Sequence, residues 1–288
     1  MTDADDPSDP GPGRPSVAST RPRSAWADEL ACATETADAA GAVLMDRYER
    51  LERIDHKSAK DVVTEADHLS EELVIDAIRA RFPGDAILAE ESGAHPAGAA
   101  WPANRRTWVI DPLDGTVNYA NGLPVFCVSI GFVVDGRPVA GAVLDPTRAE
   151  TFAATADGPA TLNGRPIRAS IKPKLSDHVI SLALDGRSVA SRAQAIRRQV
   201  RISRSMGSAA LALAYVANGR FDAFIQQSGL SAWDIAAAGL IAERAGAIVT
   251  AFDGTAWYDP ARASRAAGIV AAPASHHARL LALAAGRR

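Results

Sequence analysis

Apolar residues recur at steps of three and four along residues 26–51, which is the spacing of one face of an amphipathic helix. These positions are Trp26, Leu30, Ala33, Ala37, Ala40, Leu44, Tyr48 and Leu51. A second helix is predicted to begin at Thr64, because Asp67 stands three residues later as a capping-box partner. It should continue until the Phe82-Pro83-Gly84 sequence, which does not favour a helix. The ordered chain is therefore expected to open with two helices.

Short segments rich in β-branched and aromatic residues follow, and turns such as Asp135-Gly136 separate them. They cover residues 86–89, 107–110, 125–134, 139–144 and 151–154. This pattern predicts a largely antiparallel sheet. We expect an irregular stretch after it, around Asn163-Gly164.

The second half of the chain mixes the two kinds of pattern. Strands are predicted at 179–182, 221–225, 247–250 and 268–271, and helices at 188–199, 208–218, 234–245 and the C-terminal end. Such a mixture predicts a layered α/β or α+β architecture. We expect one domain over residues 25–288, built from two α/β halves of approximately 25–150 and 151–288.

Composition narrows the class of protein. The 288 residues are 47% hydrophobic and 23% charged, as in soluble globular proteins, and the formal net charge is −3. The charge gives no global attraction to nucleic acid or an anionic membrane, and no stretch reaches the ~18 apolar residues of a membrane helix. Residues 1–24 mix Pro, Gly, Ser and Asp, which predicts a disordered tail rather than a secretion signal. We therefore expect a cytoplasmic protein without a nucleic-acid or membrane partner.

The sequence from Thr107 to Thr116 runs from an apolar strand into Asp111 and Asp114, three residues apart. Gly115, directly after the second aspartate, permits close approach of a ligand to the backbone. Convergent carboxylates at a rigid strand end suit Mg²⁺, which prefers oxygen ligands. Asp-Pro and Asp-Gly are also common in ordinary turns, so this motif alone leaves both interpretations open.

Two further acidic motifs each have a functional and a structural interpretation. Glu90 and Glu91 end another apolar strand, either as ligands or as solvated charges. Asp234 begins an Ala-rich helix, either as a ligand or as a plain N-cap. Carboxylates gathered in one site raise one another's pKa, so such a gathering calls for cations. Divalent ions would also supply a nucleophilic water, and phosphoryl transfer then needs no side-chain nucleophile.

Six motifs resemble, in their order, those of the lithium-sensitive inositol monophosphatase family of sugar phosphatases. They are KSAKDVVTEAD at 57–67, AEES at 89–92, WVIDPLDGTVNY at 108–119, LPVFCVSIGF at 123–132, SRSMGSAAL at 203–211 and WDIAAAG at 233–239. The resemblance extends from about residue 26 to the C-terminus. It implies a fold of alternating α-β-α-β-α layers and Mg²⁺-dependent hydrolysis of a phosphate monoester, with inhibition by lithium.

The resemblance implies two or three Mg²⁺ ions. Glu90, Asp111 and the backbone carbonyl of Leu113 look like the ligands of a first ion. Asp111, Asp114 and Asp234 look like those of a second, and Glu90 would share a weaker third ion through water. Asp114 and Asp234 would also border the substrate.

The resemblance also implies catalytic and supporting roles. Asp67 and Thr116 look like the pair that orients and deprotonates the attacking water, with help from Glu90. Gly115 and the amide of Thr116 resemble the phosphate-binding backbone. Lys57 is either an ion-pair partner that holds Asp67 or a solvated loop residue, and Glu91 is a supporting residue.

The remaining matched positions concern the substrate. Gly207, Ser208 and Ala209 begin a helix that resembles the wall facing the sugar hydroxyls, although Ser208 is also a plausible plain N-cap. Arg204 either favours an anionic substrate or is a surface charge. Inositol-specific members carry a glutamate seven residues before the helix-initiating aspartate, where this chain has Gln227. An amide donates and accepts hydrogen bonds whereas a carboxylate only accepts them, so the preferred polyol stays open.

The predicted activity is hydrolysis of a small polyol or sugar phosphate, with inositol 1-phosphate as the leading candidate. The alternatives within the superfamily are fructose 1,6-bisphosphate, histidinol phosphate and the 3′-phosphate of adenosine bisphosphates. An alternative of another class is a non-catalytic regulatory protein that binds RNA or protein, although the complete acidic set argues against it. Because family members are usually dimers, we also expect a homodimer.

Overall fold

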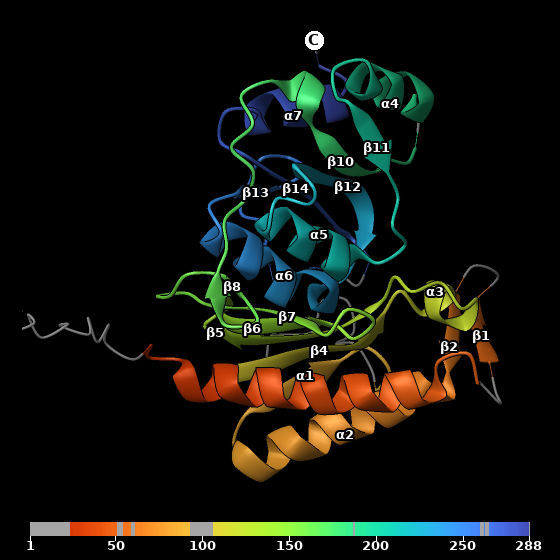
Figure 1. The fold of residues 1–288 in the computed structure, drawn as a ribbon, viewed down its shortest axis with the longest axis vertical. Coiled ribbons are helices and arrows are strands. Elements are labelled where there is room, and N and C mark those ends of the chain that lie inside the picture. The colour runs from red at the N-terminus through yellow and green to blue at the C-terminus, as the bar shows by residue number, and fades with distance from the viewer. Residues whose placement is uncertain are drawn as a thin grey trace, which may run out of the picture.

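The computed structural model describes residues 24–50, 54–58, 61–92, 106–186, 188–259, 262 and 265–287. Helices and sheets alternate in five layers along the long axis of the molecule (Figure 1). The layers are α1 (Ala27–Arg47) with α2 (Glu65–Arg81), a seven-stranded sheet, α5 (Ala209–Ala217) with α6 (Ala232–Arg244), a five-stranded sheet, and α4 (Val189–Arg197) with α7 (His277–Ala284). This order confirms the predicted α-β-α-β-α arrangement. The predicted tail, apart from Ser24, lies outside the described residues.

The two helices of the first layer follow the sequence pattern closely. In α1 the side chains of Ala33, Ala37, Ala40 and Leu44 are fully buried, so the apolar face seen in the sequence packs on the sheet. Helix α2 begins after Thr64, whose side chain forms the predicted capping box. No helix in the described part of the chain has the length and apolar character needed to cross a membrane.

The seven-stranded sheet has the strand order β3-β4-β5-β6-β7-β8-β9. Its strands are β3 (Ala86–Ala89), β4 (Arg106–Asp114), β5 (Cys127–Val134), β6 (Arg137–Asp145), β7 (Glu150–Thr155), β8 (Thr161–Leu162) and β9 (Arg165–Pro166). All neighbours pair in antiparallel fashion except β3 and β4, which are parallel. The short helix α3 (Thr116–Ala120) follows β4 directly.

The five-stranded sheet has the order β11-β10-β12-β14-β13. Its strands are β10 (Val179–Ala183), β11 (Ile202–Arg204), β12 (Ala223–Leu230), β13 (Ile248–Ala251) and β14 (Ala267–Ala272), and a single 3₁₀ turn, Leu175–Asp177, precedes the first of them. Strand β10 runs parallel to β11 and β12, whereas β14 is antiparallel to both of its neighbours. The sheet is therefore mixed.

Helix α6 packs unusually close to the seven-stranded sheet. A Cβ atom on Gly131 of β5 would lie 2.8 Å from Cβ of Ala236, and one on Gly141 of β6 would lie 2.7 Å from Cα of Ala237. The small residues on both sides are thus required for this approach. The contact carries the first turn of α6, including Asp234, toward the end of β4.

The structure corrects the sequence-based elements at four places. A hairpin of β1 (Ile54–Ser58) and β2 (Asp61–Thr64) separates the first two helices. The stretch after β7 is largely irregular, as expected, but Asn163 and Gly164 form a turn between the two-residue strands β8 and β9, with φ values of 47° and 73°. Strand β11 and helix α3 were also not predicted. All of these elements are short, so they carry little periodic signal.

Candidate active site

Asp111 and Asp114 face the same side of the sheet because β4 contains a bulge. Residues three apart in a regular strand point to opposite faces. Asp111 pairs with Ser129 and Asp114 pairs with Cys127, so β4 has one more residue than β5 between these pairs. The extra residue rotates Asp114 back to the side of Asp111. Both aspartates are buried.

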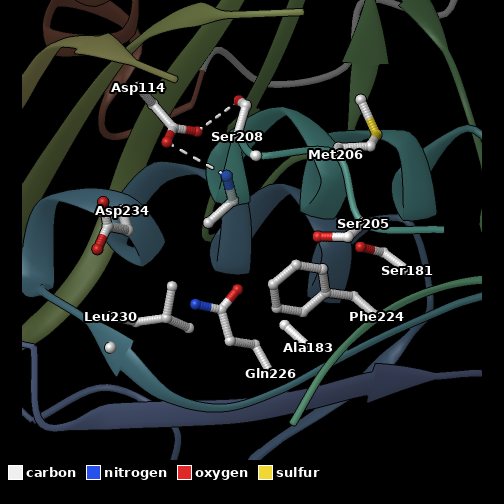
Figure 2. Close-up of a pocket in the computed structure, with 13 residues that line it drawn as sticks. Asp114, Ser181, Ala183, Ser205, Met206, Ser208, Phe224, Gln226, Leu230 and Asp234 are labelled. Carbon is white, nitrogen blue, oxygen red and sulfur yellow. Dashed lines mark hydrogen bonds between the residues drawn. The ribbon is translucent and has the colours of Figure 1, made fainter. Parts of the chain in front are cut away.

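Asp114 is held by the N-terminal turn of α5 (Figure 2). Its carboxylate accepts hydrogen bonds from Ser208 Oγ at 2.6 Å, from the backbone N–H of Ala210 at 2.7 Å and from that of Ala209 at 3.2 Å. The thiol of Cys127 lies 3.7 Å from Oδ2 of the same carboxylate. Burial raises the pKa of Asp114, while these donors oppose the rise. The helix N-terminus that we expected to face substrate therefore holds this aspartate.

Asp234 reaches the same place from α6. The helix has Ser231 as its N-cap, and the backbone N–H of Ser231 donates to Oδ2 of Asp234 at 2.6 Å. Asp234 is thus the third residue of the helix and part of a capping box, not the N-cap that was the plain alternative. The carboxylate of Asp234 thus serves the helix and also lies close to those of Asp111 and Asp114.

Three aspartates form the centre of the site. Asp111, Asp114 and Asp234 each place a carboxylate oxygen within 4.8 Å of the others. Together with Glu90 and Leu113 they line a cavity of about 160 Å³. Burial, followed by repulsion from Glu90 and Asp114, raises the pKa of Asp111 well above its ordinary value. Burial and the charge of Asp114 do the same for Asp234.

This donor set suits a hard divalent cation. Carboxylate oxygens from two separate segments, β4 and α6, meet without a histidine or cysteine ligand among them, which favours Mg²⁺-like ions over zinc. Packing several anionic groups this closely is costly in the absence of a cation, as the raised pKa values of Asp111 and Asp234 show. The residues therefore fit a metal centre.

Asp67 and Thr116 lie beside this centre and contact each other. Thr116 Oγ1 is 3.2 Å from Oδ1 of Asp67 and 3.0 Å from the carbonyl oxygen of Leu113, and it can donate its one proton to either. Oδ2 of Asp67 accepts bonds from the backbone N–H and the hydroxyl of Thr64, at 2.8 and 2.7 Å. Burial is the largest cause that raises the pKa of Asp67 to about 6, with the charge of Glu91 adding to it.

The other expected positions are less central. The backbone N–H of Glu91 donates to Glu71, so Glu91 ties the end of β3 to α2. The backbone of Lys57 lies in β1, and its side chain is outside the described residues. Arg204 is exposed, and its guanidinium donates to the neighbouring carbonyl of Ser203.

Gly115 and Gly207 both line the acidic cavity with positive φ angles, of 99° and 76°. A Cβ on Gly115 would lie 2.9 Å from the carbonyl oxygen of Val125. A Cβ on Gly207 would lie 2.9 Å from the side chain of Asn118. Both positions therefore need glycine on steric as well as conformational grounds.

A second cavity, of about 270 Å³, adjoins the aspartates and extends toward the five-stranded sheet (Figure 2). Its lining includes Ser208 and Ala209, as expected from the sequence, but not Gln227. The side chain of Gln227 instead accepts a bond from Arg192, and Gln226 lines the cavity. Strand β12 alternates its side chains between two faces, so adjacent residues cannot both face one cavity.

Gln226 and Arg265 are among the cavity-lining residues that sequence reasoning missed. Gln226 follows Phe224 by two residues, and extending the predicted strand past residue 225 would have placed both side chains on one face. Arg265 lines the acidic cavity, and its backbone N–H donates to Ser231 at 3.0 Å. Arg265 lies between two predicted elements, and no local pattern marks it.

Comparison with known proteins gives consistent results. A sequence profile described as the inositol monophosphatase family matches residues 26–287. The Nus factor SuhB of Pseudomonas aeruginosa is 39% identical over 243 residues, which cover 78% of this chain and 86% of the relative. An inositol-1-monophosphatase of Synechocystis is 38% identical over 238 residues, with 78% and 79% covered. The solved structure of a Thermotoga maritima IMPase has a TM-score of 0.78 at 31% identity, covering 90% of this chain and 97% of that one.

Proposed function

Because this chain belongs to the inositol monophosphatase family, we propose that it is a Mg²⁺-dependent hydrolase of phosphate monoesters of small polyols. Inositol 1-phosphate is the leading candidate substrate. The observation that carries this proposal is the convergence of Asp111, Asp114 and Asp234, whose carboxylate oxygens lie within 4.8 Å of one another. These residues come from two distant segments, and bound cations would relieve the repulsion among the gathered acids.

The proposed ligands follow from the geometry and the family resemblance. Glu90, Asp111 and the carbonyl oxygen of Leu113 would hold one ion, and Asp111, Asp114 and Asp234 would hold a second. Bound divalent ions neutralise phosphate oxygens, lower the pKa of water and clamp the groups of an in-line displacement. The lining of the acidic cavity supports this assignment, because it includes all five of these residues.

Asp67 and Thr116 are the proposed water-activating pair. The two side chains are in contact, at 3.2 Å, and Thr64 fixes the orientation of the carboxylate. With a pKa of about 6, Asp67 is mainly ionised at neutral pH, and its Oδ1 can take a proton from an attacking water that Thr116 orients. Glu90, which lines the same cavity, would assist. Gly115 and the N–H of Thr116 are proposed to contact the phosphate.

Phosphate release from a panel of monoesters tests the proposal. The panel contains inositol 1-phosphate, fructose 1,6-bisphosphate, histidinol phosphate and 3′-phosphoadenosine 5′-phosphate, each with MgCl₂ or with a chelator. We expect Mg²⁺-dependent turnover of the inositol phosphate. In Asp114→Asn the activation barrier should rise by several kcal/mol, which lowers the turnover rate roughly 10³-fold. Turnover that is unaffected by the chelator, or by this substitution, would refute the metal assignment.

A regulatory role is the second candidate, because several relatives, each covering 76–78% of the chain, bear the name Nus factor. The two functions can be separated in a strain that lacks the gene for this protein. Complementation by the wild-type protein is compared with complementation by the Asp111→Asn variant. Rescue by the substituted protein would favour the regulatory role, and failure to rescue would favour the enzyme.

Assembly as a homodimer stays a prediction, which light scattering on the purified protein can test.

A further inference from the structure

Arg265 is the one cation among the described residues that line the acidic cavity of about 160 Å³. The other charged residues of this lining are the acids Glu90, Asp111, Asp114 and Asp234. A phosphate monoester carries a charge of about −1.5 to −2 at neutral pH, so these acids repel it. Bound divalent cations would offset part of this repulsion. Arg265 adds a positive charge that belongs to the chain itself.

The backbone of Arg265 has an uncommon conformation at this cavity. Its φ of 61° lies in the left-handed region, which arginine rarely adopts. The backbone N–H of Arg265 donates to Oγ of Ser231 at 3.0 Å, and its carbonyl oxygen accepts from the N–H of Gly229 at 2.9 Å. Both partners also line the acidic cavity. Such conformations gather at binding sites, where the surrounding structure maintains them.

These two hydrogen bonds tie Arg265 to the segment that carries a proposed metal ligand. Ser231 is the N-cap of α6, and its own backbone N–H donates to Asp234 at 2.6 Å. Gly229 belongs to β12, which leads into this helix. Arg265 is exposed, whereas Asp111 and Asp114 are buried, so Arg265 lies at the rim of the cavity and the aspartates lie at its floor.

The two longer helices that begin at the site use their N-termini to hold aspartates. Helix N-termini commonly bind phosphate through their backbone N–H groups. At α5, however, the hydroxyl of Ser208 and two backbone N–H groups donate to Asp114. At α6, Ser231 and Asp234 form a capping box. A phosphate group therefore needs other donors, and a cation at the rim can supply them.

We propose that the guanidinium of Arg265 binds the phosphate group of the substrate at the rim of the acidic cavity. This inference rests on the proposed phosphatase function, and it adds a charged side chain to the proposed contacts from Gly115 and Thr116. A guanidinium presents a planar set of N–H donors that matches phosphate oxygens, and it stays protonated throughout the physiological pH range. The contact concerns the phosphate and not the alcohol, so inorganic phosphate should use it as well.

Binding of inorganic phosphate tests this without turnover. Isothermal titration calorimetry in MgCl₂ gives its Kd for wild type, Arg265→Gln and Arg262→Gln. Arg262 is the matched control, because it has the same charge, lies in the same connection between β13 and β14, and is not part of the described lining of the cavity. We expect the Kd to rise about tenfold in Arg265→Gln, which corresponds to about 1.4 kcal/mol, and to stay within twofold of wild type in Arg262→Gln. Arg265→Lys, which keeps the charge but not the planar fork, should lie between Arg265→Gln and wild type.

A second titration separates a phosphate contact from an effect on the metal ions. The Kd for Mg²⁺ in the absence of phosphate should not rise in Arg265→Gln, because loss of a neighbouring positive charge does not weaken the binding of a cation. A rise in this Kd that accounts for the weaker phosphate binding would mean that Arg265 supports the metal centre instead, and it would overturn the proposal.

Two further outcomes would overturn the assignment of Arg265. One is an unchanged Kd for phosphate in Arg265→Gln, and the other is an equal rise in Arg262→Gln, which would reflect net charge alone. By contrast, phosphate binding that depends on Arg265 in a protein that hydrolyses no monoester in MgCl₂ would refute the proposed function and not this contact. If thermal melting shows that Arg265→Gln is unfolded, Arg265→Asn replaces it, because asparagine adopts the left-handed conformation more readily. The same tenfold rise is then required.

Discussion

The hydroxyl group of Ser208 donates a 2.6 Å hydrogen bond to Oδ2 of Asp114, a residue 94 positions earlier in the chain. The bond joins the first turn of α5 to the end of β4. Two backbone N–H groups of α5, from Ala209 and Ala210, donate to the same carboxylate. Removing a backbone donor requires a proline, which also restricts the backbone, whereas alanine removes the Ser208 hydroxyl alone. Ser208 therefore gives experimental access to the orientation of a proposed metal ligand.

Replacing Ser208 by alanine should weaken metal binding without abolishing it. Hydrogen bonds to charged groups contribute about 1.5–3 kcal/mol, and the two backbone donors remain, so we expect a rise of about tenfold in the Kd for Mg²⁺. Isothermal titration calorimetry measures this directly. Ser191→Ala in α4 is the matched control, because its hydroxyl donates only to a carbonyl of the same helix start, that of Ser188. Equal Mg²⁺ affinity in Ser208→Ala and wild type would contradict the role.

Asp111→Asn should have opposite effects on stability with and without Mg²⁺. Without metal the substitution removes a buried charge that Glu90 and Asp114 repel, so Tm should rise. With metal, wild type should gain about 2.7 kcal/mol at a Mg²⁺ concentration 100 times Kd, and the variant should gain much less. Thermal melts in chelator and in MgCl₂ give both values. A lower Tm for the variant in chelator would show that repulsion at Asp111 is not the dominant cost.

Asp67 should make the stability of the metal-free protein depend on pH. Burial raises its pKa to about 6, so the folded protein binds this proton more tightly than the unfolded chain does. The resulting stabilisation is present below about pH 4, the pKa of an unfolded aspartate, and is lost as pH rises to about 6. We expect the free energy of unfolding to change by about 3 kcal/mol over this interval through this residue.

Urea unfolding of wild type and Asp67→Asn in chelator, between pH 4 and pH 8, isolates this contribution. As pH rises to about 6, the free energy of unfolding of wild type should fall relative to that of the variant. Above about pH 6 the difference between the two should be constant. A constant difference over the whole range would mean that Asp67 titrates at its ordinary pKa. Catalytic activity should also fall below about pH 6, as the proposed base becomes protonated.

Gly141→Ala should disturb the site from a distance. The added Cβ would lie 2.7 Å from Cα of Ala237, a backbone atom that cannot move without moving α6. We expect a loss of about 1–3 kcal/mol in the free energy of unfolding and weaker Mg²⁺ binding, because α6 carries Asp234. Gly84→Ala is the control, since a Cβ there would have no neighbour within 4 Å. Equal stability of both variants and wild type would show that α6 adjusts freely.

Local features of the site could be predicted from the sequence because their interactions span few residues. Thr64 and Asp67 are three residues apart, and this spacing alone places both in one capping box. The same spacing between Ser231 and Asp234 predicts the capping box of α6, although we placed the start of that helix at Asp234 instead. The error has a local cause, because Asp234 was considered as the N-cap and Ser231 was not.

The arrangement of Asp111 and Asp114 shows where local reasoning ends. The sequence pattern predicts a strand that ends in two acids, and the two acids do emerge together. They do so through a bulge against β5, which is set by the pairing of Asp111 with Ser129 and of Asp114 with Cys127. A regular strand would have separated their side chains. The expected convergence was therefore correct, but the pattern did not contain its cause.

The amino-acid sequence by itself determined the family, the order of helices and strands, and the acids that carry the proposed chemistry, because motifs and periodicity are local properties of the chain. Only the tertiary structure decided that α5 holds Asp114 and that Gln226, rather than Gln227, faces the cavity. Side-chain direction along β12 depends on its register against β14, which is irregular between Gln226 and Leu230. A shift of one residue would exchange the two glutamines, and long-range pairing sets that register.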